Sequence, residues 1–71
     1  MTLLEAEIGK NYIVSEIDTD DEELNDFLFT LGCYKGEKIV LVSVVGVSYV
    51  VAIRDGRYNI DEHLAGAIKI S

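Results

Sequence analysis

The sequence predicts a small, mainly β domain of the α+β kind, in which about five short strands curl into a barrel and one α-helix lies between the first two strands. Three observations predict this fold. β-branched runs alternate with glycine-bearing turns, one acidic segment carries apolar residues at helical spacing, and a short helical turn precedes the last run. With 71 residues, and with no repeat, linker or proline, the chain makes a single domain, residues 1–71.

Strands are predicted where β-branched and aromatic residues run between turn residues. In the first strand, alternation places Tyr12 and Val14 on the same side. Turns at Gly46 and at Asp55-Gly56 join the later strands as hairpins. The predicted strands are residues 10–17, 37–45, 48–54 and 58–60, followed by the end of the segment 61–70.

One helix is predicted between the first two strands, over about residues 21–31. Apolar residues recur there at i, i+3, i+4 and i+7 and form one stripe: Leu24, Phe27, Leu28 and Leu31. A capping box of Thr19 with Glu22 fits the start of this helix. Asp20 with Glu23 offers the same spacing one residue later.

The C-terminal segment predicts a short helical turn and then a strand. Asp61 is a plausible N-cap for this turn, because an aspartate side chain accepts hydrogen bonds from the first backbone N–H groups of a helix. Ile68 and Ile70 then share one side of the last strand.

Charge excludes several classes of partner. Six basic residues stand against thirteen acidic residues, and the formal net charge is −7. Nucleic acids and anionic membranes both attract basic surfaces, so neither is expected as a partner. No basic segment precedes an apolar stretch at the N-terminus, and the longest apolar run, residues 39–45, is too short to cross a bilayer. We therefore expect a cytoplasmic protein that does not insert into the membrane itself.

The stretch "TLGCYKGEKIVLV", residues 30–42, raises the question of a phosphate loop or a thiol site. It lacks the spacing and the hydroxyl residue of a P-loop. We expect Gly32 to end the helix and Gly36 to allow the turn into the next strand. Cys33 would need a base to act as a nucleophile, and His63 is the one histidine of the chain. The better interpretation of Cys33 is a small, partly buried apolar residue.

The acidic run "DTDDEE", residues 18–23, raises the question of a calcium site. A calcium loop of the EF-hand kind needs glycine at its sixth position and glutamate at its twelfth. Glu23 and Phe29 stand at those positions, so the pattern does not match. Helix capping and solvated charge explain the cluster instead. We expect no catalytic constellation, no cofactor and no metal site.

Aromatic residues are the remaining candidates for binding. Tyr34, Tyr49 and Tyr58 resemble a stacking platform for single-stranded nucleic acid, but such a platform needs a positive groove beside it. Phe29 lies roughly 140° around the helix from Leu24 and so falls outside the apolar stripe. Either a loop folds over this ring, or the ring is exposed as a docking anchor. The partner-binding hypothesis names Glu22, Glu23, Asp26 and Phe29, and the structural turns are Gly32, Gly36, Gly46 and Gly56.

Four segments, in order along the chain, resemble one known family. They are the opening "LLEAEIGKNYIVSEI", the helix end "FLFTLGCYKGEKI", the late glycine turn "IRDGRYNI" and the closing "LAGAIKI". The family is FeoA, the small SH3-like protein that accompanies the bacterial ferrous iron permease FeoB. Cys33 departs from the family pattern, in which an aliphatic residue is usual. The hairpin at Gly46 is shorter than the family's glycine- and proline-bearing loop.

The resemblance implies an SH3-like barrel and a non-enzymatic accessory or regulatory role in bacterial ferrous iron uptake and iron homeostasis. The protein would act by protein–protein interaction with the cytosolic part of the FeoB permease. It would then lie in the cytoplasm, peripherally at the inner face of the membrane. A barrel with an open strand edge also allows weak self-association.

Three alternatives remain. One is an SH3-like regulatory domain of the iron-dependent repressor type, disfavoured because those domains end a DNA-binding chain. The second is a generic peptide-binding SH3 module, ranked lower because the chain has no tryptophan and its tyrosines are scattered. The third is an enzyme, disfavoured because Cys33 and His63 are its only soft catalytic groups.

Overall fold

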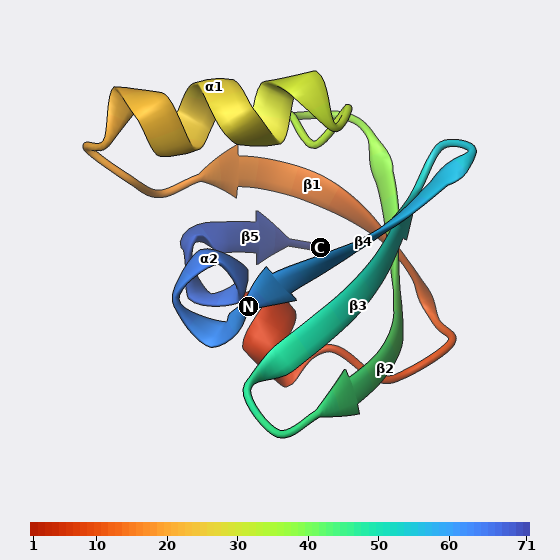
Figure 1. Ribbon diagram of the computed structural model, residues 1–71. Helices are drawn as coiled ribbons and strands as arrows, with labels where there is room; N and C mark the ends of the chain where they lie inside the picture. The colour runs from red at the N-terminus through yellow and green to blue at the C-terminus, as the bar shows by residue number, and fades with distance from the viewer.

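The computed structural model describes residues 1–71, and its elements follow the predicted order (Figure 1). A 3₁₀ turn that the sequence did not predict, η1 (Leu3–Glu5), precedes the first strand. The helices are α1 (Glu22–Thr30), between β1 and β2, and α2 (Glu62–Ala67), before β5. The strands are β1 (Asn11–Ile17), β2 (Lys38–Val45), β3 (Ser48–Ile53), β4 (Gly56–Asp61) and β5 (Ile68–Ile70). The predicted mainly β fold with these two helices is confirmed.

The five strands form one antiparallel sheet in the order β4-β3-β2-β1-β5. Figure 1 shows the sheet strongly curled, with α1 across one end and α2 beside η1. The N-terminal segment covers the β5 edge, because the Ile70 N–H donates to the Met1 carbonyl over 2.9 Å and Thr2 bridges to Lys69. The other outer strand, β4, ends the sheet.

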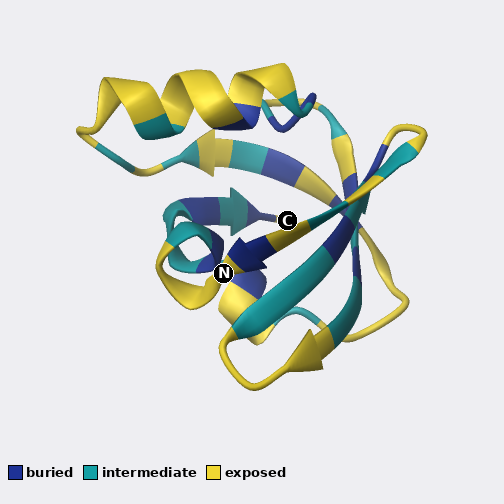
Figure 2. Cartoon of the chain, in the orientation of Figure 1, coloured by how far each residue is buried: buried dark blue, intermediate teal, exposed yellow.

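Inside the curled sheet, thirteen buried apolar residues make one cluster to which every strand contributes. No polar side chain is buried, and buried residues occur along every strand of the sheet (Figure 2). Tyr12 and Val14 are both in this core, as their alternation predicts. The Tyr12 hydroxyl accepts a hydrogen bond from the Glu7 N–H at 2.9 Å, which holds the N-terminal segment against β1. No buried side-chain nitrogen or oxygen atom lacks a hydrogen-bond partner, so burial of the core leaves no polar side chain unsatisfied.

The start of α1 differs from both predicted capping boxes. Asp21 is the N-cap, and its carboxylate accepts hydrogen bonds from the backbone N–H groups of Glu23 and Leu24 at 3.0 and 3.3 Å. Thr19 instead accepts a bond from the Asp21 N–H at 3.1 Å, so its hydroxyl holds the loop before the helix. Several adjacent residues here can cap a helix, and the extended backbone at Asp21 decides which one reaches the first turn.

The predicted apolar stripe of α1 is buried at one residue only. Leu28 is fully buried, Leu24 and Leu31 are half-buried, and the Phe27 side chain is 47% exposed. The helix lies across an end of the curled sheet rather than over a broad face (Figure 1). Only a narrow line of its surface therefore reaches the core, and its two phenylalanines stay largely in contact with solvent.

The end of α1 is the predicted glycine turn. Gly32 has φ +87, a left-handed conformation that glycine adopts without steric cost. The Cys33 N–H donates to the Leu28 carbonyl at 2.9 Å, and the Gly32 N–H donates to the Phe29 carbonyl at 3.0 Å. These two bonds define a Schellman motif, with Cys33 and Leu28 both buried beside it.

The first hairpin is confirmed and the second is shifted by one residue. Val45 pairs with Ser48 around Gly46, as predicted. The second turn consists of Arg54 and Asp55, because Gly56 already pairs with Ile53 in β4. Arg54, with φ 55, takes the left-handed position in place of the glycine.

Gly56 lies in β4 against the Tyr58 ring and is not part of the turn. A Cβ atom built on Gly56 would lie 2.3 Å from the Tyr58 hydroxyl, so the ring of Tyr58 folds over this glycine. The prediction that Gly56 is a turn residue is therefore wrong, because Gly56 already lies in β4.

The Schellman turn predicts a cost for adding a side chain at its glycine. Gly32→Ala should lower the free energy of unfolding by about 1–2 kcal/mol, because alanine is strained in the left-handed region. Its Cβ would also meet the Arg54 Cδ and Nε atoms at 3.1 Å. Urea unfolding followed by circular dichroism measures the change. Gly46→Asn is the matched control, since asparagine tolerates φ +62 and nothing lies within 4 Å of that position. Equal midpoints for Gly32→Ala and the wild type would contradict the assigned role.

Candidate functional site

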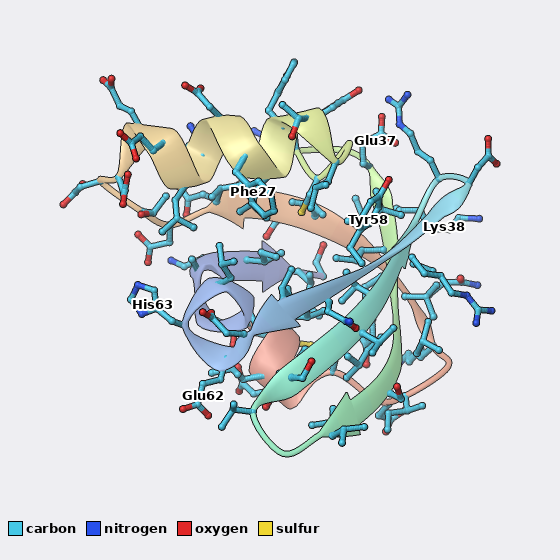
Figure 3. All side chains as sticks on the ribbon, viewed as in Figure 1. Phe27, Glu37, Lys38, Tyr58, Glu62 and His63 are labelled. Atoms are coloured by element: carbon cyan, nitrogen blue, oxygen red, sulfur yellow. The ribbon has the colours of Figure 1, made fainter.

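An open groove of about 500 Å³ lies between the C-terminal end of α1 and the turn that joins β3 to β4. In Figure 3, Tyr58 and Glu37 mark this end of the molecule, and Glu62 and His63 lie at the other side. We call it the helix-end groove. Its lining residues are Phe29, Thr30, Leu31, Gly32, Tyr34, Arg54, Asp55, Gly56 and Tyr58.

Aromatic rings from two parts of the chain form the walls of the helix-end groove. Phe29 from α1 and Tyr34 from the following loop stack with their ring centroids 4.9 Å apart and an interplanar angle of 29°. Tyr58 enters from β4. Phe29 stays 63% exposed, so the loop supports one face of this ring without covering it. An exposed ring with a fixed orientation loses little further freedom when a partner covers it.

Arg54 links the two sides of the groove. Its guanidinium lies 5.5 Å from the centroid of the Tyr34 ring, a cation–π distance, and also donates a hydrogen bond to the Tyr34 hydroxyl. It forms an ion pair with Glu37 at 2.7 Å. The hydrogen bond from Arg54 is the main reason why the pKa of the Glu37 carboxyl lies below its ordinary value. Because Arg54 is exposed and Glu37 is only half-buried, the ion pair contributes orientation more than stability.

The acidic residues named by the sequence lie on α1 beside this groove. Glu22, Asp26 and Phe29 follow one another at i, i+4 and i+7, so they share one side of the helix. All three are exposed, as is Glu23. We call Glu22 and Asp26 the acidic stripe; it runs along α1 and ends at Phe29, the ring that borders the groove. Whether these residues bind a partner stays a prediction.

Two of the predicted structural glycines, Gly32 and Gly56, line the helix-end groove, whereas Gly36 and Gly46 lie outside it. Gly36 has φ +95, and its N–H donates to the Val14 carbonyl at 2.8 Å, so this glycine ties the loop after α1 to β1.

Sequence reasoning missed Tyr34, Tyr58 and Arg54 as members of one site. Two of the four tyrosines, Tyr34 and Tyr58, line the same groove, while Tyr12 lies in the core and Tyr49 packs against it. The turn at Gly32 could be found from the sequence, and the second turn was predicted within one residue of its position at Arg54 and Asp55. No local pattern indicates that these two turns lie next to each other in the fold.

The soft catalytic candidates do not form a site. Cys33 is 1% exposed, and burial raises the pKa of its thiol to about 11. His63 is exposed on α2 and lines a second, smaller hollow with Asp18 and Glu62. No group of three His, Cys, Asp or Glu side chains converges as it would around a metal ion. Neither helix has the length and apolar character needed to cross a membrane.

The comparison with protein families decides where this chain belongs. A family model described as the FeoA domain matches residues 1–71. The chain belongs to the FeoA-domain family. A comparison with curated protein sequences gives no match.

Solved structures agree with the FeoA-domain fold. An iron uptake regulatory protein (FeoA) superimposes with a TM-score of 0.87 at 21% identity, with 99% of this chain and 93% of that chain covered. FeoA of Stenotrophomonas maltophilia in complex with zinc, described as a procaryotic SH3 domain protein, gives a TM-score of 0.86 at 21% identity, with 100% and 89% covered. These similarities establish the predicted SH3-like barrel.

The same fold occurs in a second class of proteins. A manganese-dependent transcriptional repressor gives a TM-score of 0.86 at 17% identity. That match covers 96% of this chain but only 39% of the repressor. The FeoA-domain fold is therefore shared with one part of a larger metal-dependent regulator.

The buried thiol makes a prediction about reactivity and pH. At pH 8 the thiolate of Cys33 in the folded protein should be roughly a hundredfold scarcer than in the unfolded chain, because its pKa rises from 9.0 to about 11. Its reaction with Ellman's reagent should slow by at least that factor relative to protein in guanidinium. Folded stability should fall as pH rises from 9 to about 11, because the unfolded thiol loses its proton first.

Cys33→Ala serves as the companion variant. It should remain folded, lack the alkaline loss of stability and keep its partner binding. Equal labelling rates in the folded and unfolded protein would contradict the burial of the thiol, and loss of function in folded Cys33→Ala would show that the thiol has a functional role.

Proposed function

We propose that this FeoA-domain protein is a non-enzymatic accessory or regulatory protein of bacterial ferrous iron uptake. It acts by contact with the cytosolic part of a FeoB-type ferrous iron permease. Its place is then the cytoplasm, at the inner face of the membrane where the permease is located.

Family membership supports the transport role. The FeoA model matches the whole span of residues 1–71. One structural relative is named an iron uptake regulatory protein, and another is put forward as a bacterial ferrous iron transport activating factor. Both relatives are covered over most of their own length, by 93% and 89%.

The surface around Phe29 is the observation that carries the proposal. Phe29 is a 63% exposed aromatic ring that stacks on Tyr34 and lies at the end of the acidic stripe. Aromatic residues of this kind supply much of the binding energy at protein interfaces. Acidic neighbours favour a basic patch on the partner and speed the encounter with it.

A second candidate function is a regulatory module of the metal-dependent repressor type. The observation that favours it is the structural match to the manganese-dependent repressor. The two candidates differ in their partner, because the repressor module would contact a DNA-binding domain rather than a permease. Capture experiments with both partners therefore separate them.

The proposal predicts that Phe29 contributes to capture of the permease. In a pull-down with the cytosolic domain of a FeoB-type permease, Phe29→Ser should weaken capture by about tenfold or more, because the exposed ring is the anchor of the contact. Capture by the wild type should also weaken as salt rises.

Phe27→Ser is the matched control for this experiment. Phe27 is a second half-exposed ring on the same helix, but it does not line the helix-end groove. Both variants are compared by circular dichroism to establish that they are folded. Undiminished capture by folded Phe29→Ser would refute the role of this ring, and failure of the wild-type protein to capture the permease would refute the proposed function.

A further inference from the structure

The sheet has one covered edge and one open edge. The N-terminal segment covers β5 through the Ile70–Met1 hydrogen bond and the bridge from Thr2 to Lys69. β4 pairs with β3 alone and ends the sheet at the other edge (Figure 1). We infer that this open edge pairs with β4 of a second copy of the chain, so that two copies form a symmetric dimer through one continuous antiparallel sheet. This inference goes beyond the proposed function and does not depend on it.

The β3–β4 register determines which backbone groups point to the open edge. Gly56 pairs with Ile53 across a two-residue turn, and in such a turn the N–H after the turn bonds to the carbonyl before it. Hydrogen-bonded and non-hydrogen-bonded pairs then alternate along the two strands. Arg57, Asn59 and Asp61 stand in the non-hydrogen-bonded pairs, so their N–H and C=O groups point away from β3. The bonds made by turns, loops and caps do not use the backbone groups of Arg57 or Asn59.

The charges along this edge are complementary to themselves. Arg57, Asn59 and Asp61 are all exposed, and they share one side of β4 because side chains alternate along a strand. When two β4 strands run antiparallel about a two-fold axis at Asn59, Arg57 of each copy stands directly opposite Asp61 of the other. Opposite charges in directly opposed positions stabilise strand pairing. The same register also brings the outward backbone groups of the two strands together.

Both charged side chains are available for a second copy. Arg57 takes part in none of the ion pairs within the chain. Asp61 accepts the Leu64 N–H at 2.8 Å through Oδ1 as the N-cap of α2, which leaves Oδ2 without a hydrogen bond. Arg57 and Asp61 are four positions apart in an extended strand, roughly 13 Å, so they do not pair with each other. A second copy supplies the missing partner to each.

Charge disfavours other arrangements of the same edge. A shift by two residues toward the β3–β4 turn keeps the hydrogen-bonding pattern but places Asp55 opposite Asp61 at both ends. A parallel, in-register pair places Arg57 beside Arg57. Like charges in directly opposed positions destabilise strand pairing. A head-to-tail chain of β4-to-β5 contacts is blocked, because the N-terminal segment already covers β5.

Net charge and size keep this dimer weak. Each copy carries a net charge of −7, so the long-range force between copies is repulsive. A contact between two six-residue strands buries little surface, as weak and transient interfaces do. At about 0.15 M salt the Debye length is about 8 Å, so remote charges are screened more than the opposed pairs. We therefore expect a monomer–dimer equilibrium and not a permanent dimer.

Sedimentation equilibrium of the full chain at about 0.15 M salt tests the inference. Between protein concentrations of about 0.02 and 2 mM, the average mass should rise from that of the monomer toward that of the dimer. A mass that stays at the monomer value would overturn the inference and leave the edge open to a strand of another protein. A mass that rises beyond the dimer value would show open-ended association and would also overturn it.

Charge variants locate the contact to the β4 edge. Arg57→Glu places a carboxylate opposite Asp61 at both ends of the contact and should weaken the dimer by about tenfold or more. Lys35→Glu is the matched control, because it makes the same change of charge at an exposed residue in a turn outside the sheet. It should leave the dimer dissociation constant within about twofold of the wild type. Equal dissociation constants for the two variants would contradict the assigned edge.

Reversal of both charges tests the register. Arg57→Glu combined with Asp61→Lys restores opposite charges in the opposed positions and should recover most of the lost dimerisation. Circular dichroism checks that the double variant is folded, since it loses the N-cap of α2. A folded double variant that stays as monomeric as Arg57→Glu would contradict the two-fold register at Asn59.

Amide hydrogen exchange of the wild type gives a readout that needs no substitution. Exchange at the N–H groups of Arg57 and Asn59 should slow as the protein concentration rises, because the second copy binds these groups. Exchange that slows instead at the β2–β3 hairpin tip, residues 44–47, or along α1 would place the contact elsewhere and overturn the inference.

Discussion

The hydrogen bond from the Cys33 N–H to the Leu28 carbonyl, 2.9 Å long, is the constraint on which the rest of the structure depends. It forms only because Gly32 turns the backbone into the left-handed region. The bond ends α1, sends Cys33 into the core, and brings Tyr34 back against Phe29. One backbone turn therefore fixes the helix, the packing beneath it and the first wall of the helix-end groove.

The second wall of the helix-end groove, at the β3–β4 turn, depends on the first wall, which Phe29 and Tyr34 form. Arg54 takes a left-handed backbone conformation that is costly for a residue with a side chain, by about 1–2 kcal/mol. Its contacts with Tyr34 and Glu37 join the β3–β4 turn to the loop that follows α1. Backbone strain that is held by long-range contacts often accompanies a functional surface. Here it places a guanidinium against the Tyr34 ring on a chain whose net charge is −7.

Local sequence patterns predicted the elements but not the site. Strand patterns and helical periodicity located every strand and α1, the Asp61 cap located α2, and glycine located the end of α1, because these features depend on neighbouring residues. The cap at Asp21 was missed because adjacent residues were equally suited to the role. The turn at Arg54 was missed because its conformation is held by Tyr34 and Glu37, which are distant in sequence. The sequence identified the acidic helix and Phe29 as a candidate binding surface. It did not identify Tyr34 and Tyr58, because these residues reach the groove only through the tertiary fold.

Amide chemical-shift mapping of the labelled FeoA-domain protein with the cytosolic domain of the permease tests most directly whether the helix-end groove is the contact surface. We expect the perturbed amides to cluster at residues 26–34 and 54–58, on both sides of the groove. Perturbations that cluster instead at the exposed valines of the β2–β3 hairpin, residues 44–47, would contradict this conclusion.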